Sequence, residues 1–576
     1  MTISLNNVKR NAISSANMSC LIYCISSIKQ RLFKKTLFNG VIPITFQNRD
    51  LIQNIGQLMV FGFYGKKMTP ELKQFINKNK LGNIILFSRN MDDQLQIRQL
   101  TMELQGEAKR AGHKHPLLIC TDQENGAVRR LGSGSTEFPG SMLIGATYST
   151  ANAFEISRMT AEELKSVGIN WNLAPVVDVN NNPANPVICT RSFGEDPQVV
   201  AEMGEAFMRG MQSEGIVSTL KHFPGHGDTG VDSHLDLPVI PHNLERLESV
   251  ELVPFRKCIK AGTDVIMSAH VYFPAIEKQY GLPATLSKAV LTGLLRERLH
   301  FQGVITTDCL EMKAIDDRFG TAQGAVMAFQ AGADFAMVSH TFEKQKETLE
   351  AVTSALENGK IDTQSVRNSM ERIDRLKDKY LDWGQALKKE VISVEKGEEH
   401  WTTAEKVYHE GITLLTNKQD LLPLSDRKNS KTLFLYSGMV FAAKVEDQKD
   451  QISVFESIVK SVHTESEVAK IEDPSFNVLL KNVISTTESY QAVVLLTVSI
   501  TKGSSQIDLL TQLKKTCNCP IIVIAAKSPY DLRLLPQADG YICTYDFNPL
   551  SLKIAIRTLF GLDKVYGRLP ISLNNT

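Results

Sequence analysis

Residues 265–310 read VIMSAHVYFPAIEKQYGLPATLSKAVLTGLLRERLHFQGVITTDCL, and this stretch indicates the fold most clearly. It begins and ends with a short apolar run, VIMSAHVYF (265–273) and VITTDCL (304–310). Between these runs, residues 288–299 have the mixed apolar and charged character of a helix. A strand, a helix and a second strand form the unit that joins neighbouring parallel strands, because parallel strands need a long crossover connection.

The same alternation recurs from about residue 52 onward. Further apolar runs with the length of buried strands are NIILF (83–87), PLLIC (116–120), INWNLAPVVDV (169–179), VSTLKHF (217–223) and FAMVSH (335–340). Helix-like segments lie between them, for example at residues 151–167 and 199–213. We therefore predict a (β/α)8 barrel over residues 50–385, because a block of this length suits a closed barrel with loop insertions better than a doubly wound sheet.

A second α/β domain is predicted after the barrel. The polar stretch KKEVISVEKGEEH (388–400) interrupts the alternation, and we expect a linker or bridging helix over residues 386–400. Residues 401–576 then form an α/β/α sandwich, with buried strands at KTLFLYSG (431–438), AVVLLTV (492–498), PIIVIAA (520–526) and GYICTYD (540–546). No row of carboxylates and histidines follows these strands, so we expect the domain to support the barrel rather than carry out a reaction.

The composition restricts the kind of partner. Hydrophobic residues make up 43% and charged residues 22%, as in an average soluble globular protein. Lys and Arg number 64 against 63 Asp and Glu, so the net charge of +1 gives no reason to expect nucleic acid or an anionic membrane as partner. The nine cysteines are scattered without zinc-finger spacing, which favours free thiols and a cytoplasmic location. No run approaches the roughly 20 apolar residues of a membrane span.

Residues 1–49 differ from the rest of the chain because they contain several basic residues and no acidic one. The apolar stretch CLIYCISSI (20–28) is short, and no small-residue cleavage site follows it. We interpret the segment as a peripheral N-terminal extension. Export or association with the cell wall is the alternative.

Polar residues crowd at the predicted C-terminal ends of the barrel strands. Asp122 follows PLLIC, Lys221 and His222 follow VSTL, His270 follows VIMSA, and Asp308 follows VITT. In (β/α)8 barrels the chemistry takes place at this end, so the sequence predicts one site there.

The densest polar cluster is KHFPGHGDTGVDSHLDLP (221–238). His222 and His226 have the i, i+4 spacing of zinc ligands on a helix, but the proline and glycines of the segment disfavour a helix there. A metal site and a hydrogen-bonded structural loop are therefore alternatives. A third interpretation pairs Asp232 with His234, because a carboxylate two residues away can accept the imidazole N–H and make the ring a proton shuttle.

Several motifs carry a resemblance to a known family. They are KHFPGHGDT with the D-S-H that follows, ITTDCLEM (305–312), TDQENGAVRRL (121–131), NLAPVVDV (172–179), RSFGEDP (191–197), PATLS (283–287) and GRLP (567–570). In this order they resemble the bacterial β-N-acetylglucosaminidases of glycoside hydrolase family 3. Glu124-Asn125 departs from the commoner Glu-Gly of that loop, and the C-terminal domain is lacking in single-domain members.

The resemblance implies a role for each matching residue. Asp308 corresponds to the nucleophile of a retaining glycosidase, His234 to the acid/base, and Asp232 to its orienting partner. A second Asp or Glu is the usual acid in such enzymes, and this subgroup resembles a variant that uses histidine. The resemblance also implies sugar recognition by Asp122, Arg130, Arg191, Lys221 and His222.

The predicted activity is that of a retaining exo-β-N-acetylglucosaminidase, acting on peptidoglycan fragments such as GlcNAc–MurNAc muropeptides during cell-wall recycling. A phosphorylase is the first alternative, because a neutral histidine would not repel phosphate as a carboxylate would. A barrel that binds muropeptides without turnover is the second alternative, although such a protein would be expected to lack the nucleophile or one member of the Asp232–His234 pair, and all three residues are present. No cofactor is expected, since no G-x-G-x-x-G follows a strand.

Overall fold

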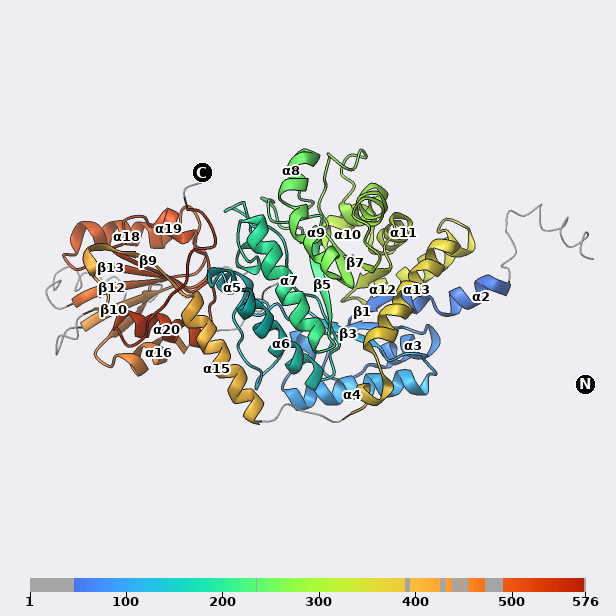
Figure 1. Cartoon of the computed structure of the whole chain (residues 1–576), viewed down its shortest axis with the longest axis horizontal. Coiled ribbons are helices and arrows are strands. Elements are labelled where there is room, and N and C mark those ends of the chain that lie inside the picture. Colours follow the sequence, from blue (N-terminus) through green and yellow to red (C-terminus); the bar gives the residue numbers. More distant parts are fainter. Residues whose placement is uncertain are drawn as a thin grey trace, which may run out of the picture.

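The computed structural model describes residues 46–234, 236–388, 394–424, 431–437, 446, 454–471 and 490–573. Figure 1 shows two bodies, a larger barrel and a smaller sheet domain, with the long helix α15 (Val394–Gly411) along their border. The first element of the described residues is α2 (Phe46–Gln53). The predicted N-terminal extension therefore lies almost wholly outside the described residues.

Eight parallel strands close the barrel in sequence order. They are β1 (Met59–Phe61), β2 (Asn83–Ile85), β3 (Leu118–Thr121), β4 (Trp171–Asn172), β5 (Val217–Phe223), β6 (Val265–Ser268), β7 (Val304–Cys309) and β8 (Phe335–Val338). Pairing of β1 with β8 completes the closure, with Met59 opposite Ala336. Every strand residue is buried except Asp308, which is partly exposed. The barrel prediction is confirmed.

Helices connect the strands and cover the outside of the barrel (Figure 1). They are α3 (Pro70–Lys78), α4 (Gln94–Arg110), α5 (Ser141–Ala146), α6 (Thr150–Ser166), α7 (Pro197–Ser213), α8 (Leu244–Ser249), α9 (Leu252–Ala261), the π-helix η5 (Ala289–Arg298), α10 (Lys313–Phe319), α11 (Thr321–Ala331), α12 (Phe342–Glu357), α13 (Thr363–Tyr380) and α14 (Trp383–Ala386), with short 3-10 turns η1 (Ile55–Leu58), η2 (Ser88–Asn90), η3 (Cys189–Arg191) and η4 (Ala284–Leu286). The start of α7 shows how local sequence sets a boundary. Asp196 accepts backbone N–H groups of the first turn, and Pro197 stands where a missing N–H costs nothing.

One predicted strand is much shorter than its apolar run. Of residues 169–179 only β4 is a regular strand, because Pro175 has no N–H to donate to a ladder, and pairing with β5 continues only as a single bridge between Val176 and Lys221. The N–H of Val177 still donates to the carbonyl of Lys221 at 2.8 Å. This contact places Asp178 beside the end of β5.

The second domain contains a six-stranded sheet in the order β11 (Glu467–Lys470), β10 (Lys431–Tyr436), β12 (Tyr490–Thr497), β13 (Ile521–Ala525), β14 (Gly540–Cys543) and β9 (Thr413–Asn417). All neighbouring strands are parallel except β14 and β9. In Figure 1, α18 (Ser505–Thr516) and α19 (Asp531–Leu534) cover one face, and α16 (Phe455–Val462) and α20 (Pro549–Leu559) cover the other. The predicted α/β/α sandwich is confirmed.

Polar contacts fix the two domains against each other. The hydroxyl of Tyr408 on α15 lies 2.8 Å from Asp546 Oδ2 in the second domain and 3.3 Å from the carbonyl oxygen of Glu137 in the barrel. On the barrel side, the Asn180 amide donates to the hydroxyl of Tyr530 at 3.0 Å. Residues 394–400 of the expected linker are helical in α15, whereas 389–393 lie outside the described residues. None of the described helices has the length and apolar character needed to cross a membrane.

Candidate active site

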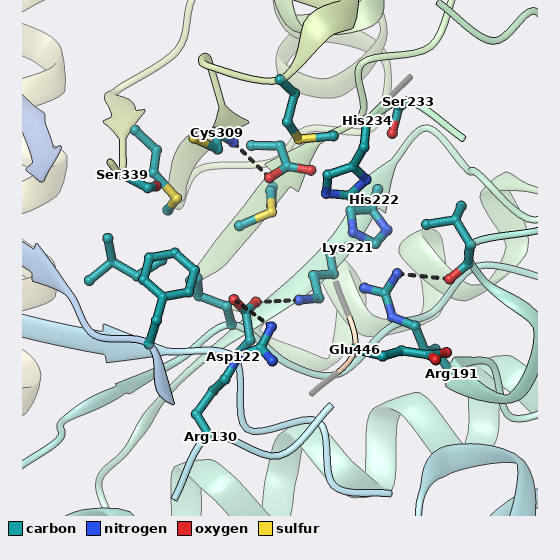
Figure 2. Close-up of a pocket in the computed structure, with 18 of the residues that line it drawn as sticks. Asp122, Arg130, Arg191, Lys221, His222, Ser233, His234, Cys309, Ser339 and Glu446 are labelled. Atoms are coloured by element: carbon teal, nitrogen blue, oxygen red, sulfur yellow. Dashed lines mark hydrogen bonds and ion pairs between the residues drawn. The ribbon is translucent and has the colours of Figure 1, made fainter. Parts of the chain in front are cut away.

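A cavity of about 340 Å3 opens at the C-terminal ends of the barrel strands. Seven of the eight predicted site residues line it, namely Asp122, Arg130, Arg191, Lys221, His222, His234 and Asp308. The eighth, Asp232, is hydrogen-bonded to the His234 ring. In Figure 2, Asp122 and Arg130 lie together below the cavity, and His222 and His234 lie above Lys221. The structure thus brings all the predicted residues to one place.

Asp308 lies near the end of β7 and reaches the cavity. Its Oδ1 accepts a hydrogen bond from the backbone N–H of Cys309 at 2.7 Å. Burial alone would raise the pKa of this carboxyl, but the nearby imidazoles of His270, His222 and His234 outweigh that effect and lower it. The Asp308 side chain is therefore an anion at neutral pH.

His270, predicted at the end of β6, contacts the backbone next to Asp308. One ring nitrogen bonds Thr285 Oγ1 at 2.8 Å, and the other lies 3.0 Å from the carbonyl oxygen of Cys309. The ring is buried, and burial lowers its pKa. His270 therefore fixes the backbone that follows Asp308.

Asp232 and His234 form a hydrogen-bonded pair on the loop after β5. Asp232 Oδ1 lies 2.7 Å from His234 Nδ1 and 2.8 Å from the backbone nitrogen of the same residue. Burial would raise the pKa of Asp232, but these hydrogen bonds lower it, so the carboxylate is charged at neutral pH. The His234 ring lines the cavity, and its Nε2 has no hydrogen-bond partner among the described residues. Such a ring can release a proton into the cavity and take one back.

A buried cluster of charges forms the floor of the cavity. Lys221 Nζ lies 2.8 Å from Asp122 and 2.6 Å from Glu124. Arg191 binds Glu124 through two hydrogen bonds, each 2.8 Å long. Burial opposes the charge on Glu124, but the two cations hold its pKa well below the ordinary value. Arg130 lies 4.0 Å from Asp122. Glu124 was not among the predicted site residues, although it pairs with both Lys221 and Arg191.

Asp178 links His222 to the loop that carries Asp232 and His234. Its Oδ2 lies 2.7 Å from His222 Nδ1, and its Oδ1 accepts the backbone N–H of His226 at 2.7 Å. The ring nitrogens of His226 bond Thr229 and Ser233 at 2.9 and 3.1 Å. Both nitrogens of His226 are thus engaged by hydroxyls, and this histidine anchors the loop between Asp232 and His234.

The lining residues that were not predicted include one carboxylate and one guanidinium, those of Glu446 and Arg89. Glu446 comes from the part of the chain beyond the barrel, and its carboxylate pairs with Lys527 Nζ at 2.6 Å (Figure 2). No motif marks either residue of this pair. Arg89 follows the run NIILF as Asp122 follows PLLIC, so its position after a predicted strand was a usable signal.

Comparisons with known proteins agree with this architecture. The chain is 39% identical over 332 residues to β-hexosaminidase A of Pseudoalteromonas piscicida, a match that covers 54% of this chain and 56% of that protein. It is 35% identical over 301 residues to a β-hexosaminidase of Stenotrophomonas maltophilia, covering 51% of this chain and 87% of that protein.

A glycoside hydrolase family 3 β-N-acetylglucosaminidase from Paenibacillus sp. str. FPU-7 has a similar structure. The two superpose with a TM-score of 0.84 at 35% identity, over 91% of this chain and 99% of that one. Residues 51–376 match the family described as Glycosyl hydrolase family 3 N terminal domain. These matches confirm the predicted family. The chain belongs to glycosyl hydrolase family 3.

Proposed function

We propose that the protein is a retaining exo-β-N-acetylglucosaminidase. The observation that carries this proposal is that an ionised carboxylate, Asp308, and a carboxylate-held imidazole, His234, line one cavity. A retaining glycosidase needs one group to attack the anomeric carbon and another to protonate the leaving oxygen.

In the first step, an Asp308 oxygen attacks the anomeric carbon and forms a glycosyl ester. The glycosidic C–O bond breaks, and the departing oxygen takes the proton of protonated His234 Nε2. Asp232 accepts the Nδ1–H of the same ring, so its negative charge stabilises the imidazolium before transfer.

In the second step, the now neutral Nε2 takes a proton from water. The water oxygen attacks the anomeric carbon from the face that the leaving group vacated, and Asp308 departs as a carboxylate. Two displacements at one carbon restore the β configuration.

Recognition of a terminal sugar is supported by the floor of the cavity. Lys221 is 2% exposed, and its contacts with Asp122 and Glu124 close the cavity at this end. Polar groups held in fixed directions suit the hydroxyls of one ring, and a closed end suits a non-reducing terminus.

For the substrate we propose N-acetylglucosaminides released from peptidoglycan, with a GlcNAc–MurNAc muropeptide as the natural form. The similar proteins named above are β-hexosaminidases and a β-N-acetylglucosaminidase, which supports the sugar at the cleaved end. A role in cell-wall recycling follows from this substrate.

Phosphorolysis is the second candidate. His234 is uncharged after the first step, so the incoming nucleophile meets no second carboxylate at that position, unlike in a glycosidase with an acidic acid/base. Phosphate could then take the place of water and give the sugar 1-phosphate.

Turnover of 4-nitrophenyl β-N-acetylglucosaminide tests the proposed nucleophile. Asp308→Ala should lower kcat/KM at least about a thousandfold, which corresponds to about 4 kcal/mol. Asp236→Ala, in an exposed residue paired with Arg318, is the matched control and should retain activity. Turnover by Asp308→Ala equal to that of the control would exclude the assignment.

Product analysis separates the two reactions. Purified enzyme is incubated with GlcNAc–MurNAc and with chitobiose, each with and without phosphate. Free β-N-acetylglucosamine as the first product in every case supports the hydrolase, whereas the sugar 1-phosphate appearing only with phosphate identifies a phosphorylase.

A further inference from the structure

Arg89 is a charged residue of the cavity wall to which the proposed mechanism gives no task. It lies in η2, directly after β2, and lines the same cavity as Asp308. Its Nε donates to the carbonyl of Phe63 at 2.9 Å, and its Nη2 donates to the carbonyl of Ser339 at 2.7 Å. These two bonds set the direction of the guanidinium before any ligand binds.

Two aromatic rings hold the guanidinium from its faces. The Arg89 guanidinium carbon lies 4.5 Å from the centre of the Tyr64 ring and 4.2 Å from that of Phe87. Tyr64 is 64% exposed, so this stack leads from the cavity to the surface. Figure 2 shows Ser339, whose carbonyl binds Arg89, on the side away from Arg191. The stack on exposed Tyr64 therefore places Arg89 where the cavity wall reaches the surface, whereas Lys221 in the floor is 2% exposed.

The charge on Arg89 lacks a close counter-ion. Within the described parts of the chain, no carboxylate oxygen lies within 4.0 Å of its guanidinium, whereas Arg191 and Lys221 each have one at 2.8 Å or less. The negative charge of Glu311 attracts Arg89 from farther away. The Glu311 carboxylate accepts two backbone N–H groups at the start of α12, at 2.6 and 3.0 Å. Burial lowers the pKa of Arg89. Keeping a partly buried cation without an anion beside it costs free energy, and a bound ligand with a negative charge would reduce this cost.

The free donors of Arg89 define the ligand chemistry. Arginine has five N–H donors, and two are used by the carbonyls of Phe63 and Ser339. The remaining donors of Nη1 and Nη2 form a planar edge that matches two oxygens of a carboxylate or phosphate.

We propose that Arg89 forms an oxyanion subsite beside the leaving group of the substrate. The proposal rests on the proposed function and adds a specificity determinant to it. The oxyanion is either the carboxylate of an acidic leaving sugar, as in GlcNAc–MurNAc, or a phosphate ion that attacks the glycosyl ester.

The carboxylate source is tested with two disaccharides, one with a free carboxylate and one in which a methyl ester removes its charge. GlcNAc–MurNAc and its methyl ester are turned over by the wild type, by Arg89→Gln and by Arg209→Gln, which alters an exposed arginine on α7 paired with Glu205. Arg89→Gln should lower the ratio of kcat/KM for the acid to that for the ester roughly ten- to hundredfold, the size of a lost hydrogen bond to a charged group. The loss should appear mainly in KM, and Arg209→Gln should leave the ratio unchanged.

The phosphate source is tested in the same variants with the ester as substrate. If phosphate is the ligand, the wild type releases the sugar 1-phosphate at a rate that saturates with phosphate, and Arg89→Gln raises the phosphate concentration for half saturation by a similar factor. The subsite is refuted if Arg89→Gln changes neither the acid-to-ester ratio nor the phosphate dependence.

Binding keeps the subsite separable from the reaction. Asp308→Asn, which lacks the nucleophile, is titrated calorimetrically with the acid and the ester, and so is Asp308→Asn/Arg89→Gln. If Asp308→Asn binds the acid more tightly than the ester, and Arg89→Gln abolishes this preference, the subsite is supported. This holds even if no variant cleaves either sugar, a result that would refute only the proposed activity. Equal affinities in all four titrations, together with unchanged phosphate dependence, contradict the subsite.

Discussion

Replacing Asp232 by asparagine removes the negative charge beside His234 and leaves the size of the side chain almost unchanged. The wild-type carboxylate accepts both the ring Nδ1–H and the backbone N–H of His234, at 2.7 and 2.8 Å. Both bonds end on the same oxygen, Oδ1, and the amide oxygen of asparagine can still accept them. It cannot stabilise the imidazolium as an anion does, so the variant ring is a poorer store for the proton that the leaving oxygen needs.

The size of the effect follows from the bond that is weakened. A hydrogen bond to a charged group contributes about 1.5–3 kcal/mol. Because each 1.36 kcal/mol of barrier changes a rate tenfold, kcat for an unactivated disaccharide should fall roughly ten- to hundredfold. An aryl glycoside with an acidic leaving group needs less protonation, so its rate should fall less.

The assay compares chitobiose with 2,4-dinitrophenyl β-N-acetylglucosaminide for the wild type, Asp232→Asn and His234→Ala. His234→Ala removes the proposed acid itself, so the loss of rate on chitobiose relative to the loss on the aryl glycoside should be largest in this variant. Asp236→Asn, in an exposed residue of the same segment, controls for a changed loop. Equal losses on both substrates in Asp232→Asn and His234→Ala would refute the assignment of the dyad as acid/base.

Two further predictions concern stability. Glu124→Gln leaves Lys221 and Arg191 buried beside a neutral group, and should lower the free energy of unfolding in urea by about 3–5 kcal/mol. The pKa of Glu124 is depressed in the fold, so its contribution to the free energy of unfolding is present above the ordinary carboxyl pKa and is lost as pH falls from about 5. The wild type should therefore lose stability with falling pH more steeply than Glu124→Gln. Parallel pH profiles would contradict this. Tyr408→Phe removes the hydroxyl that donates to buried Asp546, and should lower the free energy of unfolding by about 1–3 kcal/mol while kcat/KM on the aryl glycoside changes less than about twofold. An unchanged melting temperature would show that this contact does not stabilise the domain border.

The sequence was sufficient for the barrel, because its strands are covered on both faces and read as apolar runs. Asp122, Lys221 and Asp308 follow such runs directly, and topology alone brings these positions to one end. The lengths of the strands could be predicted less well from the sequence. β4 stops at two residues because Pro175 interrupts an apolar run of eleven, and the three residues of β1 are too few to stand out from their surroundings.

Pairings between distant residues could not be derived from one sequence. Glu124 meets Arg191 and Lys221 only because β3, β4 and β5 are neighbours, and each residue alone is typical of a surface charge. Glu446 reaches the cavity because the sandwich domain lies against the barrel, a relation that no local pattern encodes. The Asp232–His234 pair was accessible because its two members are neighbours in the chain.

The location of that pair has a consequence for how such enzymes diversify. Asp308 is part of a barrel strand, so moving it would alter the closed sheet, whereas Asp232 and His234 lie on a loop between β5 and α8 that contributes nothing to barrel closure. An insertion, deletion or exchange in this loop can therefore replace the proposed proton donor while Asp308, the proposed nucleophile, stays in place. Asp178 limits that freedom, because it holds both His222 and the backbone of His226. A grafted loop would keep sugar recognition intact only if it still offered Asp178 an N–H donor at the position of His226.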